Sequence, residues 1–128
     1  MNSSYEEITK YITEVKEAVN AGRYRIERNK NRLSNLEVYK EYVINEAETK
    51  DILMDLSADD FCKILQNEQK GFEHERLYVF GKNVKLLQRF GTGEKNVALY
   101  IKFNKLENFF VIVVSFHEQA YPLKYAFK

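Results

Sequence analysis

The sequence is poor in the residues that make covalent or metal cross-links. Cys62 is the single cysteine among 128 residues, which excludes an internal disulfide and a zinc site built from several cysteines. The two histidines, His74 and His117, do not stand at the short spacings typical of a histidine metal site. We therefore expect no metal ion and no other cofactor, and a reducing, cytoplasmic setting.

Long apolar runs are also absent. The longest, at residues 109–114 (FFVIVV), has the length of a buried strand and falls far short of the roughly 20 residues that cross a bilayer. We therefore expect no membrane association, and the polar, acidic start MNSSYEEITK predicts no secretory signal peptide. With 45% hydrophobic and 30% charged residues, the composition is that of a soluble globular protein, and the length predicts one domain, residues 1–128.

Charge is unevenly distributed although the formal net charge is only +1. Residues 1–75 contain 11 basic and 16 acidic side chains, whereas residues 76–105 contain seven basic side chains and one acidic side chain, Glu94. A basic segment in an acidic chain favours a polyanionic partner, most commonly a nucleic acid. The alternative is a solvated sheet edge whose lysines discourage pairing with other strands.

Helical patterns occupy the first half of the chain. Apolar residues three and four apart predict helices within residues 5–20, with a stop at Asn20-Ala21-Gly22, and within residues 31–44. The second apolar stripe comprises Leu33, Leu36, Tyr39, Tyr42 and Val43. A short helix is predicted at residues 48–54, and the S-x-x-D capping box at Ser57 predicts another through residues 61–65.

Strand patterns occupy the second half. We expect strands at residues 77–80, 84–87, 97–103 and 109–116, with a turn at Gly91-Thr92-Gly93, a loop at 104–108 and the most apolar strand at the centre. Short connections favour antiparallel pairing. Helices followed by a meander predict an α+β fold, in which N-terminal helices pack on one face of a C-terminal antiparallel sheet.

Three stretches together resemble the MqsR family of bacterial toxins, within the RelE-like ribonucleases. The segment VKEAVNAGR at residues 15–23, with Arg25 and Arg28 after it, is similar to the family's first helix and following basic segment. The segment ILMDLSADDFCKIL at 52–65 resembles the family pattern LS-x-x-DF-x-K, and residues 97–118 resemble its closing hairpin with a VSF end.

This resemblance implies a RelE-like α+β fold and cleavage of single-stranded mRNA without a metal ion, which arrests translation. It also implies a cognate antitoxin protein that neutralises the toxin. Such cleavage needs a base for the 2′-hydroxyl, cationic donors for the phosphorane-like transition state, and an acid for the leaving 5′-oxygen.

The resemblance assigns three candidate catalytic residues: Lys63, Tyr100 and His117. Lys63 matches the lysine that follows DF-x in the family, and Tyr100 matches a tyrosine in its VYLK-like strand. His117 stands where the family commonly has a lysine, although an imidazole can act as acid or base near neutral pH. Each also has a structural interpretation: an exposed helix lysine, an ordinary strand tyrosine, and a strand-end histidine bonded to backbone.

Strand alternation predicts how these residues are arranged. Tyr100 and Lys102 should share the face opposite Ile101 and Phe103. His117 should share a face with Ser115 and Val113, opposite Phe116. If Ile101 and Phe103 face the helices, Tyr100 and Lys102 face the open side, where RNA would lie.

Five basic side chains are the candidate RNA ligands: Arg76, Lys82, Lys85, Arg89 and Lys102. The early cluster Arg23, Arg25, Arg28, Lys30 and Arg32 either adds to this groove or is a solvated helix start. His74 matches a family histidine in position, but no glutamine matches the one proposed to act in the family's site. The tail at residues 119–128 is expected to pack on the core, with an edge strand or base stacking as alternatives.

Two other functions remain open from the sequence. A RelE-like domain without catalysis would bind RNA or a protein, and the histidine in place of the usual lysine keeps this alternative open. An interaction protein would dock a partner on its acidic helices and show no RNA affinity at moderate salt.

Overall fold

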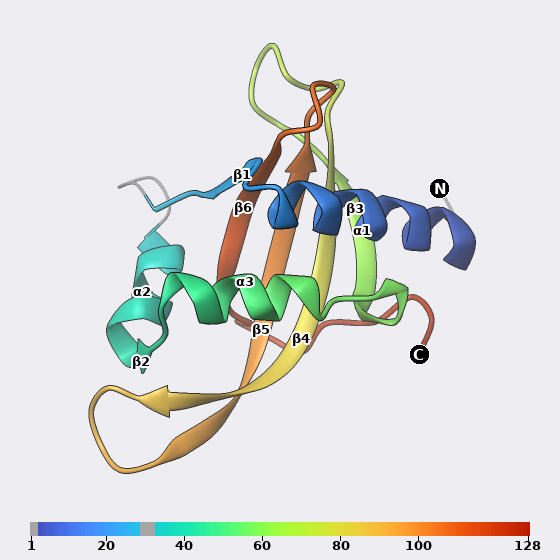
Figure 1. Ribbon diagram of the computed structural model, residues 1–128. Coiled ribbons are helices and arrows are strands. Elements are labelled where there is room, and N and C mark those ends of the chain that lie inside the picture. The colour runs from blue at the N-terminus through green and yellow to red at the C-terminus, as the bar shows by residue number, and fades with distance from the viewer. Residues whose placement is uncertain (1–2, 29–32) are drawn as a thin grey trace.

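The computed structural model describes residues 3–28 and 33–128, and they form an α+β fold (Figure 1). Its helical elements are α1 (Tyr5–Asn20), α2 (Leu33–Glu41), α3 (Glu46–Met54) and the 3₁₀ turn η1 (Ala58–Asp60). Its strands are β1 (Tyr24–Ile26), β2 (Tyr42–Val43), β3 (Phe61–Gln66), β4 (Arg76–Gln88), β5 (Glu94–Lys105) and β6 (Val111–Glu118). The expected order, helices first and the main strands second, is confirmed.

Helix α1 forms as its pattern predicts. Ser4 caps its start in a reciprocal capping box with Glu7, and its apolar stripe from Ile8 to Val19 is buried. The helix ends at Asn20 with Ala21 as its C-cap, and Gly22 adopts a positive φ of 78°, which glycine takes without steric cost. The chain thereby turns directly into β1.

The next two helices differ in detail from expectation. Helix α2 buries Asn35 and Val38. The predicted apolar stripe is wrong at both ends, because Leu33 is 63% exposed and Val43 is 41% exposed. The residues from Tyr42 form β2 and not a further helical turn. Helix α3 begins at Glu46, two residues before the predicted start, because Asn45 caps it. Residues 31 and 32 of the predicted second helix lie outside the described part of the chain.

The predicted helix at residues 61–65 is wrong. Ser57 and Asp60 do form the capping box, but it closes only η1, and Phe61 then takes extended angles, φ −71° and ψ 139°. Residues 61–66 form β3, which pairs antiparallel with β4 from Gln66 opposite Arg76 to Phe61 opposite Phe80. Pairing with β4 in the sheet buries Phe61 and outweighs the local helix-start signal.

The sheet has the strand order β1-β6-β5-β4-β2, and β3 also pairs with β4. The predicted strands 77–80 and 84–87 are one continuous strand, β4, and β5 extends into the predicted loop as far as Lys105. The sheet is mixed, because β1, which the sequence patterns miss, runs parallel to β6. The expectation that the most apolar strand lies at the centre is wrong. That strand, β6, is next to the edge, where only the three residues of β1 pair with it, and β4 and β5 occupy the centre.

The helices cover one face of the sheet. Leu99, Ile101 and Phe103 point to this face and are fully buried. The opposite face, called the distal face, carries Lys63, Val79, Gly81, Tyr100, Lys102, Ser115 and His117. The predicted placement of Tyr100 and Lys102 opposite Ile101 and Phe103 is thus confirmed.

A β-bulge in β6 changes the predicted alternation there. Lys102 is opposite Ser115, but its neighbour Phe103 is opposite Val113, so Val114 is the extra residue. Val113 consequently belongs to the hydrophobic core, on the face opposite His117 and Ser115. The expectation that Val113 shares a face with His117 is wrong for this reason.

The C-terminal tail, residues 119–128, crosses part of the distal face from β6 to β3 (Figure 1). Gln119 bonds to the backbone of β5, and the Ala126 amide donates to the Phe61 carbonyl over 3.0 Å. Leu123 and Tyr125 cover Gly81, and Phe127 packs against the core beside Phe61. The expectation that the tail packs on the core is confirmed.

Candidate functional site

Tyr100 and His117 form a stacked pair on the distal face. They are direct neighbours across β5 and β6, and their ring centroids are 5.1 Å apart with an interplanar angle of 7°. Both side chains are partly buried, and each retains solvent access. The pair can present a hydroxyl and an imidazole to one ligand.

Lys102 lies beside this pair. Its Nζ is 5.9 Å from the centroid of the Tyr100 ring, and it stands opposite Ser115, whose side chain is buried. Alternation along β5 places Lys102 two residues from Tyr100 on the same face. The distal face therefore brings together a cation, a phenol and an imidazole, which suffice to bind a phosphate and move a proton.

The backbone contact of His117 determines which ring nitrogen is basic. Nδ1 lies 2.9 Å from the carbonyl oxygen of Glu118. A carbonyl oxygen only accepts hydrogen bonds, so Nδ1 must carry the hydrogen, and Nε2 of the neutral ring is then the proton acceptor. The strand-end backbone bond expected as the structural alternative is present, and it is compatible with a base at Nε2.

The phenol of Tyr100 is in its protonated form at neutral pH. Burial raises the pKa of Tyr100 above its usual value, and the nearby Tyr121 of the tail raises it further. Tyr100 can therefore donate a hydrogen bond to an anionic oxygen.

Lys63 does not join this group. It is exposed on β3 opposite Val79, so β4 and β5 lie between it and His117 on β6. Three strand spacings separate their backbones by roughly 14 Å, before the offset along the strands is added. The expected cluster of Lys63, Tyr100 and His117 is therefore not assembled, and Lys102 is the lysine beside the pair.

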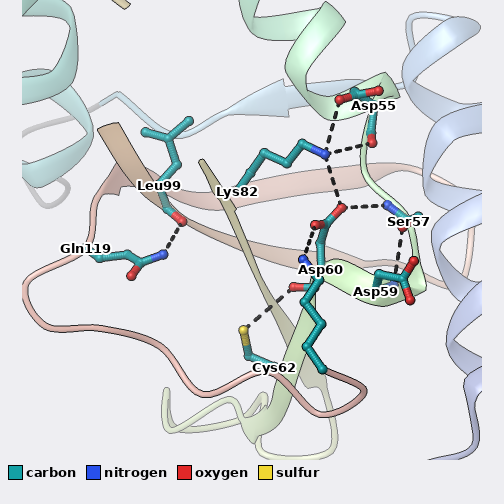
Figure 2. Close-up of polar contacts among 9 residues, drawn as sticks. Asp55, Ser57, Asp59, Asp60, Cys62, Lys82, Leu99 and Gln119 are labelled. Atoms are coloured by element: carbon teal, nitrogen blue, oxygen red, sulfur yellow. Dashed lines mark hydrogen bonds and ion pairs between the residues drawn. The ribbon is translucent and has the colours of Figure 1, made fainter. Parts of the chain in front are cut away.

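Lys82 points to the helix side of the sheet, where acidic residues bind it (Figure 2). Its Nζ is 3.1 Å from a carboxylate oxygen of Asp55 and 3.5 Å from Oδ2 of Asp60. The Asp60 side chain is 7% exposed and also accepts a bond from the Ser57 amide. These ion pairs tie η1 and the end of α3 to β4.

The remaining basic residues also divide between the two sides. Arg89 donates to the carbonyls of Tyr39 and Tyr42 and so satisfies the C-terminal end of α2. Arg76 donates to backbone carbonyls of the loop before β4. Lys85 is exposed on the distal side. The five candidate RNA ligands thus do not form one groove, and Lys85 and Lys102 alone among them project from the distal face.

The early basic cluster has local partners. Arg23 donates to the Phe109 carbonyl over 2.7 Å, Arg25 pairs with Glu27 at 2.9 Å, and Arg28 lies 4.4 Å from the centroid of the Tyr39 ring. Lys30 and Arg32 lie outside the described residues. The cluster joins β1 to its neighbours.

The sequence patterns miss a cavity further along the distal face. It has a volume of about 620 Å³, and its lining includes Leu77, Asn104, Ile112 and Glu75. The one sequence signal for it is alternation, which places Asn104 on the same face as Lys102 and Tyr100. The loop that closes the cavity, residues 67–75, has no local pattern that predicts its position.

Comparison of the chain with protein-family models, curated proteins and solved structures finds no match. Among residues 3–28 and 33–128, no helix has the length and apolar character needed to span a membrane. The same residues contain no cluster of histidine, cysteine or acidic side chains suited to hold a metal ion.

Proposed function

We propose that the protein is the toxin of a bacterial toxin–antitoxin pair, resembling the MqsR family, and that it cleaves single-stranded mRNA in the cytoplasm without a metal ion. The observation that carries this proposal is the stacked Tyr100–His117 pair with Lys102 beside it. The resemblance supplies the reaction class, and a cognate antitoxin is its proposed protein partner.

In the proposed reaction, Nε2 of His117 takes the proton of a ribose 2′-hydroxyl. The 2′-oxygen then bonds to the adjacent phosphorus, the bond from phosphorus to the 5′-oxygen breaks, and that oxygen takes a proton from a solvent water. Protonated His117 afterwards returns its proton to the hydroxide left by that water. Tyr100 donates a hydrogen bond to a phosphate oxygen, and Lys102 stabilises the added negative charge. The products are a 2′,3′-cyclic phosphate and a 5′-hydroxyl. Lys63, across the sheet, contacts RNA away from the cleaved bond.

A non-catalytic RNA- or protein-binding module is the second candidate. The separation of Lys63 from His117 favours it, because catalysis that needed both side chains at one phosphate would fail. Such a module would bind RNA with steep salt dependence and leave it intact.

The test is incubation of the purified protein with mixed-sequence RNA in EDTA, alongside His117→Ala. His74→Ala is the matched control, because His74 is exposed in the loop before β4. We expect fragments ending in a 2′,3′-cyclic phosphate from the wild type and from His74→Ala, and none from His117→Ala.

RNA that stays intact would contradict cleavage in the absence of ribosomes. A repeat on translating ribosomes then separates the two candidates. Cleavage there that needs His117 supports a ribosome-dependent toxin, and intact message bound by the protein supports the non-catalytic module.

A further inference from the structure

The distal-face cavity has an apolar floor. Leu77 of β4 and Ile112 of β6 both stand opposite Asn104 of β5, and Val114 at the bulge continues the same surface. Phe72, 45% exposed, lines the cavity from the loop before β4. An apolar floor facing a partly exposed aromatic ring is suited to a flat ring system.

The polar side of this cavity is built around Glu75. Its Oε1 accepts hydrogen bonds from the side-chain amides of Asn67 and Asn104, each over 2.9 Å. Within the described part of the chain, Oε2 of Glu75 and Oδ1 of the buried Asn104 accept no hydrogen bond. The Arg25–Glu27 ion pair also lines the cavity. Glu75 and Asn104 therefore offer acceptors to a ligand whose edge carries adjacent donors.

The position of the cavity suits one base of a single-stranded RNA whose backbone also reaches the Tyr100–His117 pair. Asn104 lies two residues from Lys102 on the same face of β5, about 7 Å along the strand. This is about the span between successive nucleotides, so a base held at Asn104 leaves its neighbouring phosphate near Lys102.

We propose that this cavity binds one unpaired base of the RNA, with guanine preferred, an inference that rests on the proposed function for its substrate. Guanine carries two adjacent donors, N1–H and the N2 amino group, on its Watson–Crick edge, and Glu75 and Asn104 accept from them. Phe72 stacks on the ring. Adenine presents a single amino donor on that edge and binds less well.

The test uses labelled 2′-deoxy oligonucleotides, which cannot be cleaved through a 2′-hydroxyl, so binding is measured apart from catalysis. Three probes of about ten nucleotides are compared by fluorescence anisotropy: all adenine, one central guanine, and one central hypoxanthine, which lacks the N2 amino group. We expect the guanine probe to bind about tenfold more tightly than the adenine probe, with hypoxanthine between them.

Glu75→Gln is the decisive variant. Its side-chain oxygen still accepts from Asn67 and Asn104, which preserves the loop, but an amide donor replaces the acceptor at Oε2. We expect this variant to lose the guanine preference and keep its affinity for the adenine probe. Glu73→Gln, an exposed neighbour that does not line the cavity, is the matched control and should keep the preference.

Equal binding of the three probes by the wild type, or an unchanged preference in Glu75→Gln, would overturn the assignment of this cavity. A guanine preference that needs Glu75, in a protein that never cleaves RNA, would support the cavity and remove the catalytic proposal. Cleavage of RNA without any preference for guanine would support the catalytic proposal and remove the assignment of this cavity.

Discussion

Asn35 shows how one buried side chain can hold an irregular piece of backbone. It is 1% exposed, and its amide donates to the carbonyls of Glu27 and Val114 while its Oδ1 accepts from the Phe116 amide. These contacts satisfy backbone groups of Val114 and Phe116 at the bulge in β6, and of Glu27 just after β1. The amide thus joins α2 to the strand that carries His117.

Replacement of Asn35 by alanine should destabilise the protein by about 3 kcal/mol, because buried backbone groups lose their partners. The measurement is urea denaturation at neutral pH. Asn96→Ala, at an exposed position of β5, is the control and should change the free energy of unfolding by less than about 0.5 kcal/mol. Equal effects of the two substitutions would contradict the role given to Asn35.

Cys62 is a second residue whose surroundings determine its chemistry. Burial raises the pKa of its thiol to about 11, although a backbone hydrogen bond with Gly81 and the charges of Lys63 and Lys128 act in the opposite direction. We expect the thiol to react with iodoacetamide at pH 8 about 100-fold more slowly than the same thiol in urea, since the thiolate is the reactive form. A rate equal to that of the unfolded chain would show that the thiol is not held protonated.

The same shift makes stability depend on pH. Because the folded-state pKa lies above the unfolded value, the contribution is complete below about pH 9 and is lost as the pH rises through 11. Alkaline titration of the urea midpoint, compared with Cys62→Ala, measures it, and the variant should lose less stability between these pH values.

Among the elements, the C-terminal tail has the most direct connection with the candidate site. It covers Gly81 with Leu123 and Tyr125, and Tyr121 lies near Tyr100. A Cβ added at Gly81 would stand 2.5 Å from the Tyr125 hydroxyl and 3.0 Å from a Leu123 methyl group. The glycine is therefore needed for the close approach of the tail to β4, and its φ is not in the left-handed region.

Gly81→Ala should displace the tail and cost about 1 kcal/mol of stability. The displacement is measured as faster hydrogen exchange at the Ala126 amide, which bonds to Phe61. In the background of Tyr125→Ala, the added methyl group should cost less, because its nearest neighbour has been removed. An Ala126 amide that stays equally protected in the single variant would contradict this packing.

Strand β3 and the bulge of β6 explain why local patterns fail at particular elements. The capping box at Ser57 is real, yet only one turn follows it, because Phe61 gains more by packing against Phe80 in the sheet. At the bulge, a single extra residue moves Val113 into the core. Both outcomes depend on pairing with another strand, which local patterns do not describe.

On the scale of the whole molecule, strand geometry divides the basic segment. Lys82 and Lys85 are three residues apart on β4 and therefore face opposite sides of the sheet. Lys82 binds Asp55 and Asp60 on the helix side, whereas Lys85 is exposed on the distal side. A net positive segment consequently does not give one positive surface.

For the proposed binding of RNA, this division predicts different effects of the three lysines. Lys102→Ala and Lys85→Ala should each lower the slope of log binding constant against log salt by about 0.7, as expected for one lost phosphate contact to a single strand. Lys82→Ala should leave the slope unchanged and instead lower the urea midpoint, because Asp60 is buried. A changed slope in Lys82→Ala would place RNA on the helix side.

The sequence by itself determined the α+β order, the core stripe of α1 and the shared face of Tyr100 and Lys102. Those features follow from periods of 3.6 and 2.0 residues and from capping groups close by in the chain. It also supplied the resemblance that names Lys63, Tyr100 and His117, with no information on their separation.

Only the tertiary structure decided which of these side chains meet. Strand order and register place His117 against Tyr100, put two strands between Lys63 and His117, and turn Lys82 toward Asp60. The same packing folds the tail across Gly81 and closes the cavity at Glu75. Contacts between distant segments depend on the burial of whole faces and the satisfaction of backbone groups, which no local sequence pattern encodes.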